Sequence, residues 1–236
     1  KDHIKHPDAN FYGRRVGRPL NQSRQEVIDS LLPALGIRVD DLKCDASLRP
    51  DTLFPTQDFK EHWLEIGFGT GEHLSTLLQR HPDIGWIGVE PFINGMGALL
   101  KDIAALNKTP ENIRVYMDDA IVLAQSLSDH SLDGIYILNP DPWHKTRHHK
   151  RRIVRPETLD LYARILKPGG QLIMSTDVPY LAEWMVTHAS NHPDFTWSVQ
   201  RAKDWQIPPD GWVHTAYETK RAKGADKMVY LIFTRK

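Results

Sequence analysis

Between residues 62 and 233 the sequence alternates short runs of β-branched and aromatic residues with segments whose apolar residues recur at every third or fourth position. The first pattern predicts buried strands and the second predicts amphipathic helices. Such alternation is typical of an α/β fold, with a doubly wound, mostly parallel sheet and helices on both faces. The predicted strands are 63–66, 86–89, 113–116, 132–138, 171–176, 195–199 and 228–233, and the predicted helices are 74–78, 96–106, 120–127, 156–166 and 180–190.

The last two predicted strands have no clear helical pattern between them, so we expect one of the seven strands to run antiparallel. The residues before the alternation predict an extension over 1–50, followed by the main domain over 51–236. The extension begins with a basic arm over 1–22, which is either a binding element or a terminal tail without a role. A capping box at Ser23–Glu26 predicts a short helix that ends near Pro33 or Gly36.

Composition limits the possible partners and compartments. Lysine plus arginine and aspartate plus glutamate both number 30, so only local charge clusters can support nucleic-acid binding. The single cysteine, Cys44, excludes an internal disulfide and a multi-cysteine metal site. No apolar run reaches the length of a membrane span, and residues 1–22 are too polar for a secretory signal. We therefore expect a cytoplasmic protein that binds neither membrane nor metal, as a monomer or a homodimer.

A glycine-rich turn follows the first predicted strand and contains Gly67, Gly69 and Gly71. Such a turn is typical of nucleotide sites, although on its own it is also common as a plain tight turn. Glu90 closes the second strand about 20 residues after Gly69, which is the spacing of an acid that accepts hydrogen bonds from ribose hydroxyls. Asp119 and its neighbour Asp118 close the third strand, where either one would meet an adenine. Taken singly, each of these acids could instead be a solvated loop residue or a helix cap. Together these residues predict an adenosine-containing ligand.

Two carboxylates flank the glycine turn, Glu65 before it and Glu72 after it. A pyrophosphate needs a neutral turn with free backbone N–H groups, so this pair disfavours a nicotinamide dinucleotide. Carboxylates suit the ammonium and sulfonium of S-adenosylmethionine, which we therefore predict as the cofactor. Glu65 either anchors the ammonium directly or orients the turn.

The fourth predicted strand runs into the segment Asn139-Pro140-Asp141-Pro142-Trp143, which we call the NPDPW turn. Its prolines end the strand, because proline has no N–H for a ladder. Asn139 and Asp141 should then lie at the carboxyl end of a central strand, where open α/β sheets bind ligands. Asp141 should therefore share one edge of the sheet with Glu90.

A cationic segment follows the turn, and residues 145–155 contain no acid. We call this segment the basic strip and predict that it contacts the phosphates of a nucleic acid, although a solvated helix face is the alternative. His144, His148 and His149 accompany it without the cysteines or acids of a zinc site. The cations of the strip are Lys145, Arg147, Lys150, Arg151, Arg152 and Arg155.

These motifs stand in the order of a known family: Glu65–Gly71, Gly88–Glu90, Asp119-Ala120, Pro140–Arg152, Thr176-Asp177 and Thr215–Glu218. From residue 11 to the last predicted strand the chain resembles the bacterial tRNA (guanine-N7)-methyltransferases, which are Rossmann-like class I S-adenosylmethionine-dependent enzymes. The resemblance implies that the substrate is a variable-loop guanine of tRNA. It also implies cofactor contacts at Glu65, Glu90, Asp119 and Asp141, and substrate contacts at Lys145, Asp177, Thr215, Tyr217 and Glu218.

The chemistry of guanine N7 defines what such a site must do. N7 carries a lone pair and no proton, so its methylation needs alignment more than a general base. Guanine N1–H and N2–H are donors, and the carboxylates of Asp141 and Asp177 are our candidates to accept them and to offset the positive charge that develops on the ring. Asp177 has an alternative reading as a helix N-cap. Trp143 and Tyr217 either stack on a splayed base or pack in the core.

Three other functions remain open from the residues. An amino methyltransferase acting on adenine N6 or glutamine resembles Asn-Pro-Pro-aromatic at this position, whereas here Asp141 separates the prolines. A non-catalytic RNA-binding module would not need the strand-end acids. A nicotinamide dehydrogenase is disfavoured by the acids around the glycine turn.

Overall fold

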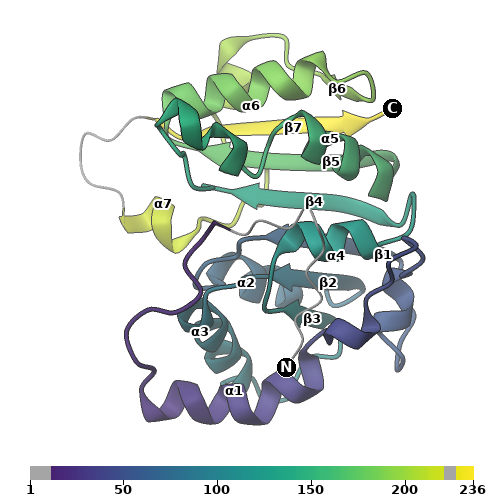
Figure 1. Ribbon diagram of the computed structural model, residues 1–236, viewed down its shortest axis with the longest axis vertical. Helices are drawn as coiled ribbons and strands as arrows, with labels where there is room; N and C mark the ends of the chain where they lie inside the picture. The colour runs from purple at the N-terminus through teal and green to yellow at the C-terminus, as the bar shows by residue number, and fades with distance from the viewer. Residues whose placement is uncertain (1–11, 221–226) are drawn as a thin grey trace. The chain divides into compact units, whose positions relative to one another are not determined.

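The structure, a computed structural model, describes residues 12–220 and 227–236 (Figure 1). The chain divides into two compact units, residues 1–128 and 129–236. The first part of the basic arm falls outside the described residues, as does the segment 222–226, which contains less glycine than the family resemblance leads us to expect. The division predicted at residue 50 stays a prediction.

The first unit contains three parallel strands, β1 (Glu61–Ile66), β2 (Ile84–Val89) and β3 (Ile113–Tyr116), in the order β3-β2-β1. Each strand is followed by a helix: α2 (Glu72–Arg80), α3 (Ile93–Ala104) and α4 (Ala120–Ser126). Leu64, Ile87 and Val115 are fully buried in this sheet, as expected where both faces of a parallel strand are covered. All six of these elements were predicted, with ends shifted by a few residues.

The helix α1 (Gln22–Leu35) packs against α3 and begins two residues earlier than predicted. Its N-cap is Asn21, whose side-chain oxygen accepts the N–H of Arg24 at 3.0 Å. The predicted capping by Ser23 is therefore wrong, because asparagine is an equally good cap and stands upstream of it. Of the two predicted ends, Gly36 is the C-cap, whereas Pro33 lies inside the helix. Two 3₁₀ turns, η1 (Val39–Asp41) and η2 (Pro50–Leu53), lead on to β1.

The second unit contains four strands, β4 (Leu132–Leu138), β5 (Leu166–Thr176), β6 (Phe195–Trp197) and β7 (Val229–Arg235), in the order β4-β5-β7-β6. β4 and β5 are parallel, whereas β7 runs antiparallel to both β5 and β6. This confirms the prediction of one antiparallel strand among seven. β5 begins earlier than predicted, because Leu166 pairs with Leu132 before the register shifts and pairing resumes at Gln171.

The helices α5 (Pro156–Ile165) and α6 (Pro179–Asn191) contact each other and β5. Like η1 and η2, three short elements of this unit were not predicted: the 3₁₀ turns η3 (Thr146–Arg151) and η4 (Ala202–Trp205), and α7 (Ala216–Lys220). No helix among the described residues has both the length and the apolar character needed to cross a membrane.

Candidate functional site

The glycine turn between β1 and α2 has the backbone that its sequence predicts. Gly67, Gly69 and Gly71 have φ values of 72°, 60° and 85°, in the left-handed region that glycine tolerates best. Among the described residues, a Cβ atom added to Gly67 or Gly69 would meet no atom within 4 Å, so these residues leave room for a ligand at this part of the turn. A Cβ added to Gly71 would lie 2.7 Å from the Cβ of Leu99 on α3. Glycine is therefore required at position 71 both for its positive φ and for the close packing against Leu99.

This difference between the glycines predicts different losses of stability. Gly67→Ala adds only the cost of a left-handed alanine, about 1–2 kcal/mol, whereas Gly71→Ala adds the overlap with Leu99, about 1–3 kcal/mol more. Urea unfolding of the two variants would measure the difference. Equal losses in the two variants would contradict the packing role of Gly71.

The carboxylate of Glu90 is held against the glycine turn. Its Oε2 accepts the N–H of Gly69 and its Oε1 accepts the N–H of Phe92, both at 2.9 Å. The side chain lies at the end of β2 and is 9% exposed. The structure thus brings together the acid and the glycine that sequence spacing paired, and two backbone donors fix how the carboxylate points.

Glu65 lies at the buried end of β1 and makes a contact that the sequence did not indicate. Its Oε2 is 2.8 Å from Nδ1 of His73 on α2, and both side chains are 2% exposed. Of the two readings left open, this contact favours orientation of the turn, because the pair ties β1 to the helix that follows the glycines. The sequence does not predict this role of His73, because its spacing does not distinguish it from an ordinary helix residue.

Asp118 and Asp119, at the end of β3, make different contacts. Asp119 is buried and caps α4, accepting the N–H of Ile121 at 2.9 Å. Asp118 accepts the N–H of Asp119 at 2.7 Å and pairs with Arg15 at 2.6 Å. The helix-cap reading therefore holds for Asp119, and Asp118 links this strand end to the arm.

The NPDPW turn follows β4 with an unusual backbone. Asn139 and Trp143 have φ values of 49° and 44°, which are rare for residues other than glycine. The N–H of Asn139 donates to the carbonyl of Ser175 on β5 at 2.9 Å. Asp141 is exposed, and within the described residues no hydrogen bond or ion pair to its carboxylate is recorded. The turn therefore presents this carboxylate to solvent.

The side chain of Asn139 has an unmet acceptor. Its Oδ1 is buried and has no hydrogen-bond partner among the described residues, while its Nδ2 lies 3.4 Å from Oγ1 of Thr215. A buried acceptor without a donor is a frequent sign of a missing ligand or water. The sequence placed Asn139 at the strand end but gave it no role.

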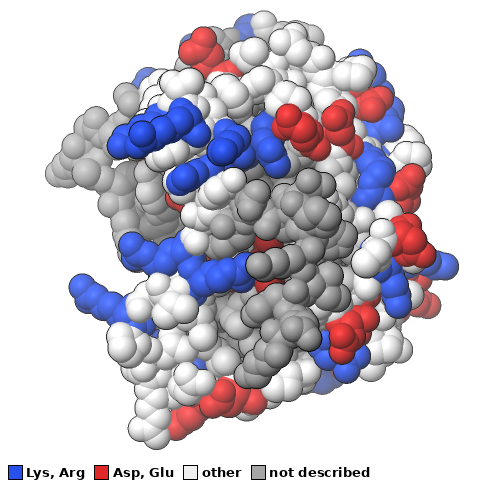
Figure 2. Space-filling model, in the orientation of Figure 1, with Lys and Arg blue, Asp and Glu red and all other residues white. Residues whose placement is uncertain are grey.

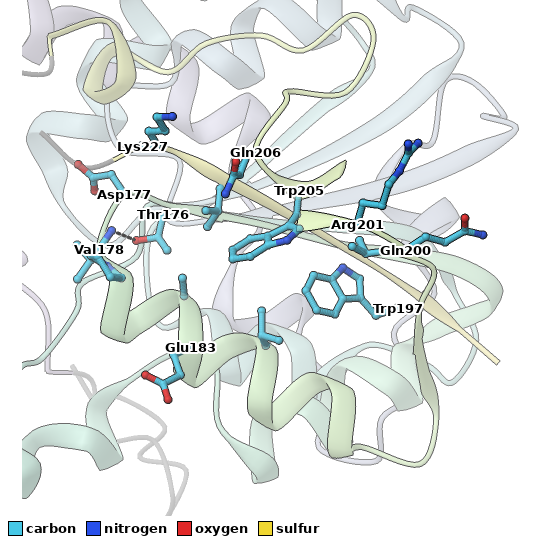
Figure 3. A pocket seen from close by; sticks show the side chains of 15 residues that line it. Thr176, Asp177, Val178, Glu183, Trp197, Gln200, Arg201, Trp205, Gln206 and Lys227 are labelled. Carbon is cyan, nitrogen blue, oxygen red and sulfur yellow. Dashed lines mark hydrogen bonds between the residues drawn. The ribbon is translucent and has the colours of Figure 1, made fainter. Parts of the chain in front are cut away.

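Asp177 follows β5, and its two carboxylate oxygens each lie 3.3 Å from the hydroxyl of Tyr217. The N-cap of α6 is Val178, whose N–H donates to Oγ1 of Thr176. The alternative reading of Asp177 as an N-cap is therefore wrong. Instead, Asp177 lies at one end of a pocket of about 650 Å³, with Trp197 and Trp205 at the other end (Figure 3).

The segment Thr215–Glu218 has the Thr-x-x-Glu spacing of a capping box, and the structure contains the hydrogen bond from the backbone of Glu218 to the side chain of Thr215. Oγ1 of Thr215 accepts the N–H of Glu218 at 3.1 Å, at the start of α7. The side chain of Glu218 is 3% exposed and accepts from Trp212 Nε1 at 3.2 Å and contacts His214 Nδ1 at 2.8 Å. Glu218 therefore organises its own loop, whereas the ring of Tyr217 is 53% exposed.

The basic strip separates into an exposed part and a buried part. Figure 2 shows Lys and Arg side chains over the teal segment that Figure 1 draws between β4 and α5, and Lys145, Arg147 and Lys150 are exposed. Arg151 is half-buried, with its Cζ 5.0 Å from the centre of the Trp143 ring. Arg152 is only 3% exposed, which does not suit the phosphate contact predicted for it.

The histidines of this segment contact aromatic rings. His148 packs edge-on against Trp143, with ring centres 5.8 Å apart, and His144 Nδ1 contacts the hydroxyl of Tyr180. Partial desolvation lowers the pKa of His148, and the positive charges of Arg151 and Arg147 lower it further. In the described part of the chain, no group of three or more metal-ligating side chains comes together.

The sequence matches a family described as "Putative methyltransferase" over residues 60–231. Among curated proteins, the tRNA (guanine-N(7)-)-methyltransferase of Rhodospirillum rubrum is 41% identical, over 97% of this chain and 89% of the relative. The enzyme of the same name from Azorhizobium caulinodans is 44% identical, over 95% of this chain and 94% of the relative.

Among solved structures, TrmN from Thermus thermophilus has a TM-score of 0.52 at 15% identity, covering 79% of this chain and 47% of that one. A 16S rRNA (adenine(1408)-N(1))-methyltransferase from Catenulisporales acidiphilia has a TM-score of 0.50 at 15% identity, covering 82% and 96%. At these identities the likeness concerns the fold alone. With the strand order of each unit, it confirms the predicted class of fold.

Proposed function

Because the chain belongs to the methyltransferase family that its residues 60–231 match, we propose that it transfers the methyl group of S-adenosylmethionine to N7 of a variable-loop guanine in tRNA. The observation that carries the proposal is the similarity, over nearly the whole chain, to relatives named tRNA (guanine-N(7)-)-methyltransferase. The position of the guanine within tRNA follows from the resemblance of the motifs.

The residues of the first unit fit S-adenosylmethionine, which supplies an activated methyl group on a sulfonium. Glu90 is fixed by two backbone N–H groups and suits ribose hydroxyls. None of the described side chains fills the space over Gly67 and Gly69, so they let a ligand approach the backbone there. We assign the adenine to Asp119, the ammonium end to the turn that Glu65 orients, and a further cofactor contact to Asp141, as the motifs imply.

The residues of the second unit fit a guanine and its RNA. Asp141 and Asp177 supply acceptors for guanine N1–H and N2–H and negative charge near a ring that becomes positive. Since N7 has no proton to lose, these side chains act by aligning the guanine with the methyl group. Complete alignment of two reactants lowers an activation barrier by roughly 7–11 kcal/mol. Tyr217 is exposed enough to stack on a base, while Thr215 and Glu218 shape the loop that carries it.

The exposed cations of the basic strip are proposed to bind phosphate, each adding to the salt dependence of RNA binding. Lys145, Arg147 and Lys150 are exposed, and Arg151 is half-buried. Arg152 is not among the proposed phosphate ligands, because its side chain is buried.

The double substitution Arg147→Ala plus Lys150→Ala is expected to reduce the slope of log K against log salt for tRNA binding by about 1.5, because each phosphate contact contributes about 0.7–0.9. Fluorescence titration of tRNA at several salt concentrations measures the slope. The control is Arg38→Ala plus Lys60→Ala, which removes two exposed cations of the first unit. A double variant of the strip with the wild-type slope would count against phosphate binding there.

The whole proposal is tested by incubating the protein with labelled S-adenosylmethionine and total tRNA. Label should enter tRNA, and borohydride–aniline cleavage should then map N7-methylguanine to the variable loop. N6-methyladenine in a digest of the product would favour the amino methyltransferase instead. Failure to bind S-adenosylmethionine by calorimetry would favour a non-catalytic RNA-binding module.

A further inference from the structure

Arg152 differs from the other cations of the basic strip because its side chain is inside the protein. It is 3% exposed, whereas Lys145 and Lys150 are exposed. We propose that Arg152 is a positioning residue that fixes the NPDPW turn and thereby the carboxylate of Asp141. The inference rests on the role proposed above for Asp141.

The guanidinium of Arg152 binds the end of the turn directly. Its Nε donates to the carbonyl of Pro142 at 3.0 Å, and Nη2 lies 3.4 Å from the carbonyl of Trp143. These carbonyls belong to consecutive residues, so one planar group spans the peptide that follows Asp141-Pro142. The fixed fork of an arginine suits two neighbouring acceptors, which the single ammonium of a lysine cannot match.

Two aromatic rings of α6 hold the guanidinium in place. Its Cζ lies 4.5 Å from the centre of the Trp184 ring and 5.7 Å from that of Tyr180, within the range of cation–π attraction. Trp184 is itself anchored, because its Nε1 donates to the carbonyl of Val154 at 2.7 Å. The turn is thus tied through Arg152 to a regular helix.

The energetics of burial point to the same role. Desolvation lowers the pKa of Arg152, and within the described residues no ion pair joins it to a carboxylate. A buried cation is costly unless hydrogen bonds and nearby electron-rich groups compensate it. Here the compensating groups are the turn carbonyls and the two rings, so the contacts that keep Arg152 inside are the same contacts that hold the turn.

The turn needs such support because its backbone is strained. Asn139 and Trp143 both have positive φ and bracket the segment that contains Asp141. Such residues persist only where the surroundings fix them. Asn139 is fixed by its bond to the carbonyl of Ser175, and Arg152 supplies the corresponding fixation at the other end.

The test compares Arg152→Lys, which keeps the charge, with Arg164→Lys, the same change on α5. Hydrogen exchange of the free protein is followed at the amide of Asn139, whose N–H donates to the carbonyl of Ser175, with tRNA methylation measured in parallel. Arg152→Lys should exchange about tenfold faster or more at this amide and lose about 100-fold in kcat, with the salt slope for tRNA unchanged. Arg164→Lys should match the wild type in all three measurements.

Either of two results would overturn the proposal. One is wild-type exchange of the Asn139 amide in Arg152→Lys. The other is a variant with wild-type kcat at saturating tRNA but a reduced salt slope, which would make Arg152 a phosphate ligand. Trp184→Phe, which removes the anchor to Val154, should change exchange and kcat in the same direction, and it decides the matter if Arg152→Lys fails to fold.

The exchange measurement also separates this inference from the proposed function. It uses the protein alone, so a protective role of Arg152 would be seen even if the wild type methylated no tRNA. In that case the proposed function would be wrong, but the conclusion that Arg152 holds the NPDPW turn in place would remain. Conversely, methylation of tRNA by the wild type together with unchanged exchange in Arg152→Lys would support the proposed function and refute the positioning role of Arg152.

Discussion

Replacing Asp141 by asparagine is expected to lower kcat for guanine methylation by about 100- to 1,000-fold while the protein stays folded, the range seen when one preorganised polar group is removed from an active site. The carboxylate of Asp141 is exposed and has no recorded partner among the described residues, so the fold has little use for its charge. Asparagine has nearly the same shape, but it cannot offset the charge that develops on the purine, and its amide nitrogen cannot accept an N–H.

Turnover is measured at saturating tRNA and S-adenosylmethionine, with unfolding in urea as the check on the fold. The control is Asp160→Asn on α5, which neutralises a carboxylate that is 76% exposed in the same unit. It should leave kcat close to the wild-type value. A folded Asp141→Asn protein that methylates tRNA at the wild-type rate would remove Asp141 from the mechanism.

The regular elements could be predicted from sequence because each depends on its own apolar pattern. β4 is an example, since its apolar run ends at two prolines and both ends of the strand follow from local rules. The short elements could not be predicted in this way. α7 has five residues and η3 follows no apolar repeat, so both depend on contacts with residues far along the chain.

The candidate site was predictable where one residue type at one spacing carries the chemistry. Glu90 follows β2 as predicted and accepts the N–H of Gly69, while its contact with a ribose stays a prediction. The partners that orient the acids were not predictable, because the contacts of His73 and Arg152 depend on packing between elements. Arg152 shows the limit most clearly, since composition alone cannot distinguish a buried arginine from its exposed neighbours. That Glu90 and Asp141 share one edge concerns two separately described units and stays a prediction.

Glu90→Gln is expected to weaken binding of S-adenosylhomocysteine, the product form of the cofactor, by about 10- to 100-fold, which is the loss of one charge-assisted hydrogen bond. Calorimetry without RNA measures this affinity, so the result does not depend on which base is methylated. The matched control is Glu111→Gln, which neutralises an exposed carboxylate of the same unit. Its affinity should equal that of the wild type.

Glu90→Gln should also lower the stability of the protein, an effect that can be distinguished from the loss of ligand affinity. Both carboxylate oxygens accept backbone N–H groups, from Gly69 and Phe92, whereas glutamine offers one oxygen and one NH₂. One of the two N–H groups must lose its acceptor, so stability should fall by about 1–3 kcal/mol. Glu90→Asp keeps the charge but shortens the reach, and it should lose stability with a smaller loss of affinity if charge matters most to the ligand. Wild-type affinity in a folded Glu90→Gln protein would mean that Glu90 serves only to hold the glycine turn.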